Sequence, residues 1–400
     1  MASVVDTSVK HFHSGQVGAP VLTGAAGSMI ALLDACLVNG FGLKSVTSLV
    51  VAGGVATITV AGTNSAVVDS VILVAGVTGA LTALNGEQKV TASAVVGGDS
   101  TLSFATAAAD GTAAGTITVK QASAGWSKAF AGTNLAVYRS DDVTSNRRFV
   151  RIADTATHRS RIHVYENMTA VSSGTGPMPT SGQVSGGAYL PKLAPGFPTA
   201  SASGWAIFAN GKRVFLFVAD YLSQGAGYTA GFLLGWGDFP SFKPGDTYNT
   251  FLCAGIASDI SHGLALLGFG AGGSQMWIQR LHTGAANARS AGKYSVGDGN
   301  VAGAGPWGPM PAPAGGGLYL VPSWLSCDDI GTYGLRGALP GLWQSPQTIA
   351  AGVLAHGDIV PGVGATAGRR LFALRTTSSS GDTSFQPGSF IDITGPWPGD

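Results

Sequence analysis

Two histidines near the start of the chain have the spacing of a minimal metal site. His11 and His13 are separated by one residue, so in an extended segment both imidazoles lie on the same side. A stable zinc or copper site needs further ligands, and the sequence places no third ligand beside this pair. The two histidines are weak metal candidates, and no metal or other cofactor is predicted.

Carboxylates are the second kind of residue that could do chemistry. The aspartate pairs at 141–142 and 328–329 are adjacent in the chain, and neighbouring residues of a strand point to opposite faces. Neither pair by itself supplies the facing acid and base of glycoside hydrolysis. Residues 268–273 match GxGxxG, but a strand-like run follows them where a nucleotide-binding fold has a helix. We expect no catalytic residues and no enzyme.

Arginines gather between residues 147 and 161, where they could form an anion site. They are Arg147, Arg148, Arg151, Arg159 and Arg161. The alternation over residues 148–152 more simply places arginines on a solvated or interface face of a strand. This simpler interpretation is favoured, and it makes Arg148 and Arg151 interface candidates.

Large aromatic residues are the remaining candidates for binding. Tryptophans could stack on a glycan, but they more often anchor a core or a subunit interface. The aromatic interface candidates are Trp205, Phe215, Phe217 and Trp236.

The sequence that contains these residues predicts a protein built mainly of β-strands. Asn210-Gly211 stands between two apolar runs, and such a dipeptide predicts a hairpin with a type I′ turn over residues 204–220. The outgoing run Val214–Val218 does not alternate, which predicts burial on both faces. Charged residues are only 11% of the chain and glutamate is nearly absent, which argues against long helices. The apolar stripe in Ala25–Asn39 predicts one short helix.

The predicted fold is all-β, with a sandwich or barrel-like main body, one short N-terminal helix and an inserted small β domain. The insert is indicated by a nearly aromatic-free block of short strands and glycine turns from Ser45 to Gln121. Similar landmarks near residues 186 and 316, and near 211 and 368, hint at a duplication. The predicted divisions are an arm and helix (1–44), the insert (45–122), a main β domain (123–260) and a C-terminal β domain that could be its pseudo-repeat (261–400).

Charge and cysteine content narrow the class of protein. A net charge of +1 without a basic block argues against nucleic-acid binding. A surface so poor in charge favours assembly with other subunits over a monomer. Three cysteines far apart imply buried thiols rather than disulfides or a zinc site. The start of the chain lacks the pattern of a signal peptide, and no apolar run is long enough for a membrane span.

Several stretches resemble uncharacterised virion proteins of tailed bacteriophages and prophages. They are Val9–Gly42, Gly132–Ser140, Tyr165–Thr180, Gly235–Tyr248, Leu335–Gln344 and Ile391–Trp397. The insert is similar to small β domains that recur in phage structural proteins. The resemblance carries no catalytic residue with it.

The resemblance implies a virion structural protein, most plausibly of the tail, baseplate or tail tip, made in the bacterial cytoplasm and located in the virion. Its expected partners are copies of itself in a ring or trimer and other virion proteins. A receptor-binding or capsid-decoration protein that contacts a host cell-surface glycan or receptor is the alternative. A tail-associated glycan hydrolase is the third possibility.

Overall fold

The computed structural model describes the greater part of the chain. The described residues are 3–219, 231–256, 274–285, 290–291, 293–294, 317–329, 332–345, 347, 349, 353–376 and 388–399. Strands take up 48% of the structure and helices 7%, so the predicted all-β class is confirmed. The strands form curled antiparallel sheets, as expected for a sandwich or barrel-like fold.

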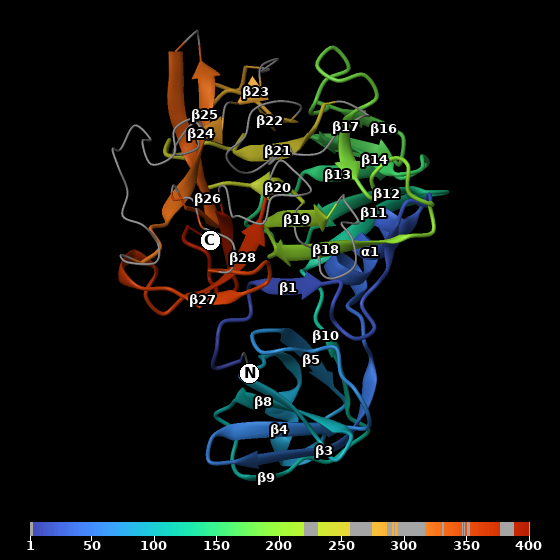
Figure 1. The fold of residues 1–400 in the computed structure, drawn as a ribbon, viewed down its shortest axis with the longest axis vertical. Coiled ribbons are helices and arrows are strands. Elements are labelled where there is room, and N and C mark those ends of the chain that lie inside the picture. Colours follow the sequence, from blue (N-terminus) through green and yellow to red (C-terminus); the bar gives the residue numbers. More distant parts are fainter. Residues whose placement is uncertain are drawn as a thin grey trace.

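The largest sheet has thirteen strands and forms the centre of the molecule (Figure 1). Its members are β1 (Lys10–His13), β2 (Leu22–Thr23), β11 (Trp126–Gly132), β12 (Leu135–Ser140), β13 (Phe149–Ala153), β14 (Arg159–Tyr165), β17 (Ala188–Pro191), β18 (Ala202–Ala209), β19 (Arg213–Ala219), β20 (Phe232–Asp238), β21 (Thr250–Gly255), β22 (Ser274–Ile278) and β23 (Ser290–Ala291). The main path runs β1-β18-β19-β20-β21-β17-β14-β13-β12-β11. The sheet curls until β11 reaches the turn between β18 and β19, where Trp126 Nε1 donates to Asn210 O at 2.9 Å.

The predicted hairpin is confirmed as β18 and β19, which pair from Gly204↔Ala219 to Ala209↔Val214. Its turn is not type I′, because neither Asn210 nor Gly211 lies in the left-handed region. The Asn210 side chain instead accepts from the amides of Lys212 and Arg213, both at 2.9 Å. An asparagine side chain that bonds nearby amides offers the backbone another way to turn.

Burial of the outgoing strand on both faces is also confirmed, since every residue of β19 is buried. One face points into the curl of the sheet, where helix residues such as Leu32 belong to the same apolar cluster as Leu216. The other face is covered by the C-terminal part of the chain. There Phe215 lies 5.4 Å from Trp397 between ring centroids, and Phe208 of β18 lies 5.1 Å from Phe372. Each such buried side chain contributes about 1.5–3 kcal/mol.

The covering layer is a six-stranded sheet with the order β24-β25-β26-β29-β28-β27. Its strands are β24 (Lys293–Tyr294), β25 (Val321–Asp329), β26 (Thr332–Gln344), β27 (Ile359–Pro361), β28 (Arg370–Arg375) and β29 (Gly388–Asp392). A 3₁₀ turn, η3 (Gly364–Thr366), lies between β27 and β28. The predicted boundary at 260/261 lies outside the described residues, whereas β22 and β23 belong to the main sheet.

The N-terminal arm is built into its own chain. β1 pairs with β18 from Lys10↔Ala209 to His13↔Ala206, and β2 pairs with the start of the same strand. The predicted helix begins later than expected, as α1 (Ser28–Leu33), and continues as a π-helical segment, η1 (Asp34–Asn39). Gly40 follows with a φ of 68°, in the left-handed region where glycine commonly ends a helix. Cys36 in η1 and Cys253 in β21 are buried free thiols, as expected.

The segment between residues 44 and 121 forms a separate eight-stranded sheet below the body (Figure 1). Its strands are β3 (Lys44–Ala52), β4 (Val55–Val60), β5 (Val71–Ala75), β6 (Gly86–Lys89), β7 (Ala92–Val96), β8 (Asp99–Ala105), β9 (Gly111–Thr112) and β10 (Thr118–Gln121), with the 3₁₀ turn η2 (Gly79–Leu84). Its core residues, among them Ile58 and Phe104, form an apolar cluster distinct from that of the body. A small hairpin, β15 (Asn167–Ala170) and β16 (Ser173–Thr175), completes the elements.

Polar contacts join the insert to the body. The Lys89 ammonium donates to the carbonyls of Ile393 and Thr394 at 2.6 and 2.9 Å. Two ion pairs lie nearby, Arg370 with Asp69 at 2.6 Å and Lys10 with Glu87 at 2.9 Å. Partly exposed ion pairs of this kind contribute about 1 kcal/mol or less each.

Excision of the insert is therefore expected to leave the body folded. Ser45 and Thr118 are cross-strand partners, so an Asn-Gly turn can replace residues 46–117. We expect the free energy of unfolding of the body to fall by about 1–3 kcal/mol, the value of the lost junction contacts. Urea unfolding followed by near-UV circular dichroism measures the change. A shortened chain without fixed tertiary signal would contradict the prediction.

Candidate binding surface on the curled sheet

Four neighbouring strands place basic and aromatic side chains on the outer face of the main sheet. The register aligns Arg151 of β13 with His163 of β14, and Arg161 of β14 with Tyr189 of β17. Because alternate residues of a strand share a face, Arg139 of β12 and Tyr165 of β14 lie on the same side of the sheet as these four residues. The resulting arginine face consists of Arg139, Arg151, Arg161, His163, Tyr165 and Tyr189.

Arg161 is held in place from several sides. Its guanidinium carbon lies 3.6 Å from the centroid of the Tyr189 ring, a cation–π contact. Its Nη1 donates to the carbonyl of Ser185 at 3.0 Å and also to that of Gly187. The guanidinium therefore has a fixed position. Its partners are carbonyls and an aromatic ring, which carry no negative charge, so its positive charge is not neutralised.

The other two arginines on this face are fixed in a similar way. Arg151 Nε donates to the carbonyl of Val171 at 2.7 Å, in the loop between β15 and β16. Arg139 lies over the ring of Phe149 at 4.6 Å and donates to the carbonyl of Arg147 at 2.9 Å. Within the described part of the chain, neither of these side chains is hydrogen-bonded to a carboxylate.

His163 lies between Arg151 and Arg161 and is only 9% exposed. Its Nδ1 is buried and has no hydrogen-bond partner among the described residues, and its ring lies 5.5 Å from that of Tyr165. Burial, followed by the charges of Arg151 and Arg161, lowers the pKa of His163 to about 4. The imidazole is therefore neutral at pH 7 in a site of positive potential.

The structure separates Arg148 from Arg151, which the sequence interpretation had placed together. β13 begins at Phe149, so Arg148 precedes the strand, and its Nη2 reaches the carbonyl of Thr247 at 3.4 Å. The two residues differ in parity along the chain, so one face of the strand cannot present both. Arg151 stays a surface candidate, together with His163 and Tyr189, which the sequence analysis had not selected.

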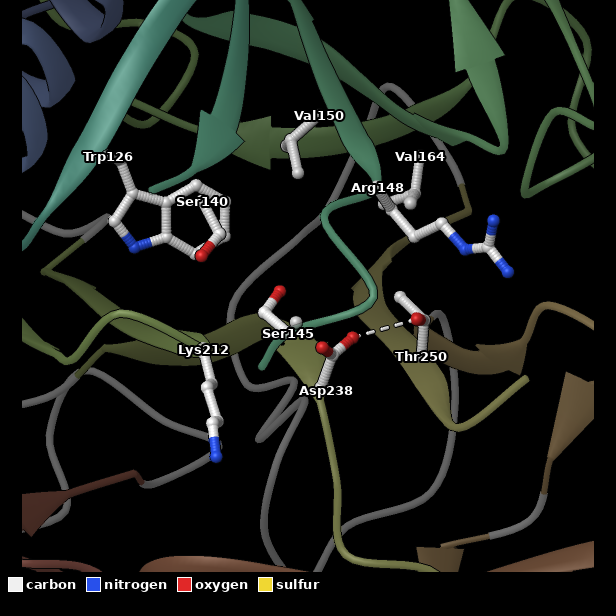
Figure 2. A pocket seen from close by; sticks show the side chains of 10 residues that line it. Trp126, Ser140, Ser145, Arg148, Val150, Val164, Lys212, Asp238 and Thr250 are labelled. Atoms are coloured by element: carbon white, nitrogen blue, oxygen red, sulfur yellow. Dashed lines mark hydrogen bonds between the residues drawn. The ribbon is translucent and has the colours of Figure 1, made fainter. Parts of the chain in front are cut away.

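Arg148 lines a small pocket at one end of the curl. The pocket is lined by Trp126, Ser140, Ser145, Arg148, Val150, Val164, Lys212, Gly237, Asp238 and Thr250. In Figure 2, Arg148 extends away from Asp238 at the centre of the view. The space is about 230 Å³ only when its open, solvent-filled mouth is included, and the enclosed part has room for about one water molecule at most.

Asp238 in this pocket has a structural role. Its carboxylate accepts from the amide of Asn146 at 2.6 Å and from the hydroxyl of Thr250 at 2.8 Å (Figure 2). Burial raises the pKa of Asp238, and these hydrogen bonds oppose the increase. The contacts attach the loop before β13 to β20 and β21, and they account for the available lone pairs.

His11 and His13 lie on the same side of β1, as the spacing predicts. Burial, followed by the charges of His13, Lys89 and Arg370, lowers the pKa of His11 to about 3. A cationic neighbourhood of this kind also disfavours a metal ion. Among the described residues, no three histidine, cysteine or acidic side chains are grouped as a metal site.

The aromatic interface candidates lie inside the chain. Trp205 is 2% exposed, and Phe215, Phe217 and Trp236 are fully buried. The Trp205 indole donates to the carbonyl of Pro20 at 3.0 Å, which ties it to the N-terminal segment. These side chains are core residues of a single chain, the alternative that sequence analysis had left open, and they cannot contact a partner in this fold.

The chain was also compared with known proteins. It matches no protein-family model and no curated protein. Within the described part of the chain, no helix is both long and apolar enough to span a membrane. The resemblance to phage virion proteins therefore stays a prediction. The exposed surfaces of the chain are the remaining observations that bear on its function.

Proposed function

We propose that this chain is a structural protein of a bacteriophage virion that assembles with copies of itself, in the tail or baseplate. The proposal rests on the resemblance and on one observation about the insert. Its strand β7 is an edge strand whose five residues are all exposed. Val95 and Val96 are each 65% exposed, and the strand has neither charge nor proline.

Natural proteins protect free strand edges with lysine, proline, bulges or a covering element. An edge without this protection is suited to pairing with a strand of another chain. The chain is poor in charge, since charged residues are only 11% of it, and seven of its carboxylates are held in ion pairs within the chain. The pairs are Lys10–Glu87, Lys128–Asp34, Lys192–Asp154, Arg280–Glu166, Arg336–Asp246, Arg369–Asp392 and Arg370–Asp69.

Two measurements test this proposal. Mass spectrometry of purified virions should detect the chain, and native mass spectrometry should show an oligomer of the free protein. Val95→Lys should weaken self-association at least tenfold, because it introduces a charge at the open edge. Val55→Lys is the matched control, since Val55 is 43% exposed but lies on the interior strand β4. A monomer that is absent from virions would refute the proposal.

The second candidate function is host attachment or capsid decoration by the insert, which projects from the body (Figure 1). The shortened chain that lacks residues 46–117 separates the two functions. If β7 joins the copies, the shortened chain is a monomer. If the insert is an attachment module, the oligomer persists and phage carrying the shortened chain lose adsorption to host cells.

A further inference from the structure

The positive charge of the arginine face has no compensating carboxylate. The nearest acidic residues in the chain are committed elsewhere, since Asp154 pairs with Lys192 in the interior and Glu166 pairs with Arg280. Besides burial, which has the largest effect, the charges that lower the pKa of His163 are those of Arg151 and Arg161, and no carboxylate opposes them. Two fixed guanidinium groups and a buried imidazole with an unpartnered nitrogen therefore form a site of uncompensated positive potential.

Two glycines lie against this site, the exposed Gly186 beside the Arg161 guanidinium and the buried Gly187 against the imidazole of His163. A Cβ at Gly187 would lie 2.2 Å from His163 Cε1, so only glycine fits against the imidazole. A Cβ at Gly186 would lie 3.6 Å from the Arg161 guanidinium, so a longer side chain there would cover that group. Arg161 is already held by Tyr189 and two carbonyls. Such preorganisation lowers the entropy that a ligand must lose on binding.

The composition of the face selects the class of ligand. In another copy of this chain, seven of the described carboxylates are already held in ion pairs. A folded protein partner needs an apolar interface centre, and no described residue of this face is a strongly exposed large apolar side chain. Nucleic acid needs a longer basic track than a chain of net charge +1 provides. Of these classes of ligand, a polar polymer that carries carboxylates at intervals best fits a face on which arginines are flanked by tyrosines.

We propose that the arginine face binds a carboxylate-bearing polysaccharide, with one carboxylate held between Arg151 and Arg161 beside His163. This inference is independent of the virion proposal, because it concerns a property of the isolated chain. A bound carboxylate would also favour protonation of His163. The groups that face its imidazole are Arg151 on β13, Arg161 and Tyr165 on β14 and Tyr189 on β17.

Isothermal titration of the full chain with a polyuronate oligosaccharide tests the proposal. We expect binding at low salt that Arg151→Gln together with Arg161→Gln weakens at least tenfold. Lys243→Gln, which removes an exposed charge elsewhere, should leave the affinity unchanged. Binding should be tighter at pH 5 than at pH 7, and His163→Gln should remove this difference. No binding of the polyuronate, or an equal effect of the control substitution, would overturn the proposal.

A second pair of variants avoids loss of the arginines. Gly186 is exposed and has a φ of +75°, a conformation that aspartate and asparagine both tolerate. Gly186→Asp places a carboxylate of the chain beside Arg161 and should abolish polyuronate binding, whereas Gly186→Asn should retain most of it.

Poly-L-glutamate and inorganic phosphate serve as competing probes. Tighter binding of poly-L-glutamate would indicate an acidic protein segment, and displacement by phosphate alone would indicate a simple anion site; either result would overturn the polysaccharide assignment.

Discussion

Replacing Asp154 by asparagine is expected to lower the free energy of unfolding by about 3–5 kcal/mol. Asp154 and Lys192 are both fully buried, with 2.5 Å between Asp154 Oδ1 and Lys192 Nζ. The ammonium also donates to the carbonyls of Ala25 and Ala156 at 2.8 and 2.9 Å. Asp154 Oδ2 accepts from the amide of Met29 at 2.8 Å and so caps the start of α1. The pair therefore joins the helix, β13 and the loop after β17.

The loss is large because the remaining charge stays buried. Burial lowers the pKa of Lys192, while the hydrogen bond and charge of Asp154 oppose this change. With asparagine in place, Lys192 must either keep an uncompensated charge or lose its proton. The double variant with Lys192→Met should recover part of the stability, since it removes the stranded charge.

Urea unfolding at pH 7 measures these differences, and Glu87→Gln is the control. Glu87 pairs with Lys10 at 2.9 Å, but its side chain is 35% exposed, so the loss should be about 1 kcal/mol or less. If Asp154→Asn cost no more than Glu87→Gln, the buried pair would contribute little to the fold.

The strands of the central hairpin could be predicted because the signal is local. Two apolar runs separated by Asn210-Gly211 define β18 and β19, and the missing alternation in β19 predicts burial on both faces. The turn type could not be predicted, because the Asn210 side chain replaces a main-chain acceptor for the amide of Arg213. That alternative competes with the type I′ turn for the same residues.

The arginine face could not be assembled from the sequence alone. The spacing of Arg161 and His163 along β14 indicates a common face, and this signal was available. The position of Arg151 opposite His163 depends on the register of β13 and β14, which a shift of one residue would invert. Tyr189 joins the face only through the pairing of β17 with β14, across the intervening β15–β16 hairpin.

The place of the N-terminal arm also depends on a long-range pairing. Its polar, turn-prone sequence predicts an extended segment but carries no information about which strand it pairs with. The partner is β18, about 190 residues further along, as shown by His11↔Phe208. This pairing places His11 between the main sheet and the insert, where it is 2% exposed and its Nδ1 has no partner among the described residues.

Acidification from pH 6.5 to pH 4 is expected to destabilise the chain through its buried histidines. In the unfolded chain a histidine has a pKa of about 6.5. In the fold, burial lowers the pKa of His11 to about 3 and those of His163 and His356 to about 4, with neighbouring arginines contributing to each decrease. Between these values the unfolded chain binds more protons than the native chain, so the free energy of unfolding decreases as the pH falls.

The size and the window of this effect distinguish it from titration of carboxylates. Each of the three histidines can contribute about 3 kcal/mol by pH 4, since one pKa unit corresponds to about 1.4 kcal/mol. Lowered carboxylate pKa values, such as those of Glu166 and Asp246, remove stability only below about pH 4.5. A decrease that is already present between pH 6.5 and pH 5 therefore reports on the histidines.

Urea unfolding at several pH values, with His11→Leu as the test variant, measures the contribution of the most strongly shifted histidine. Leucine removes the titrating ring from a site where His11 Nδ1 makes no hydrogen bond, so the pH 7 stability should change little. The free energy of unfolding should depend less steeply on pH between 6.5 and 5. The expected decrease in slope corresponds to about one bound proton, roughly 1.4 kcal/mol per pH unit. An unchanged slope in His11→Leu would show that this imidazole is protonated, or accessible, in the native chain, and the cationic junction with Lys89 and Arg370 would then need another explanation.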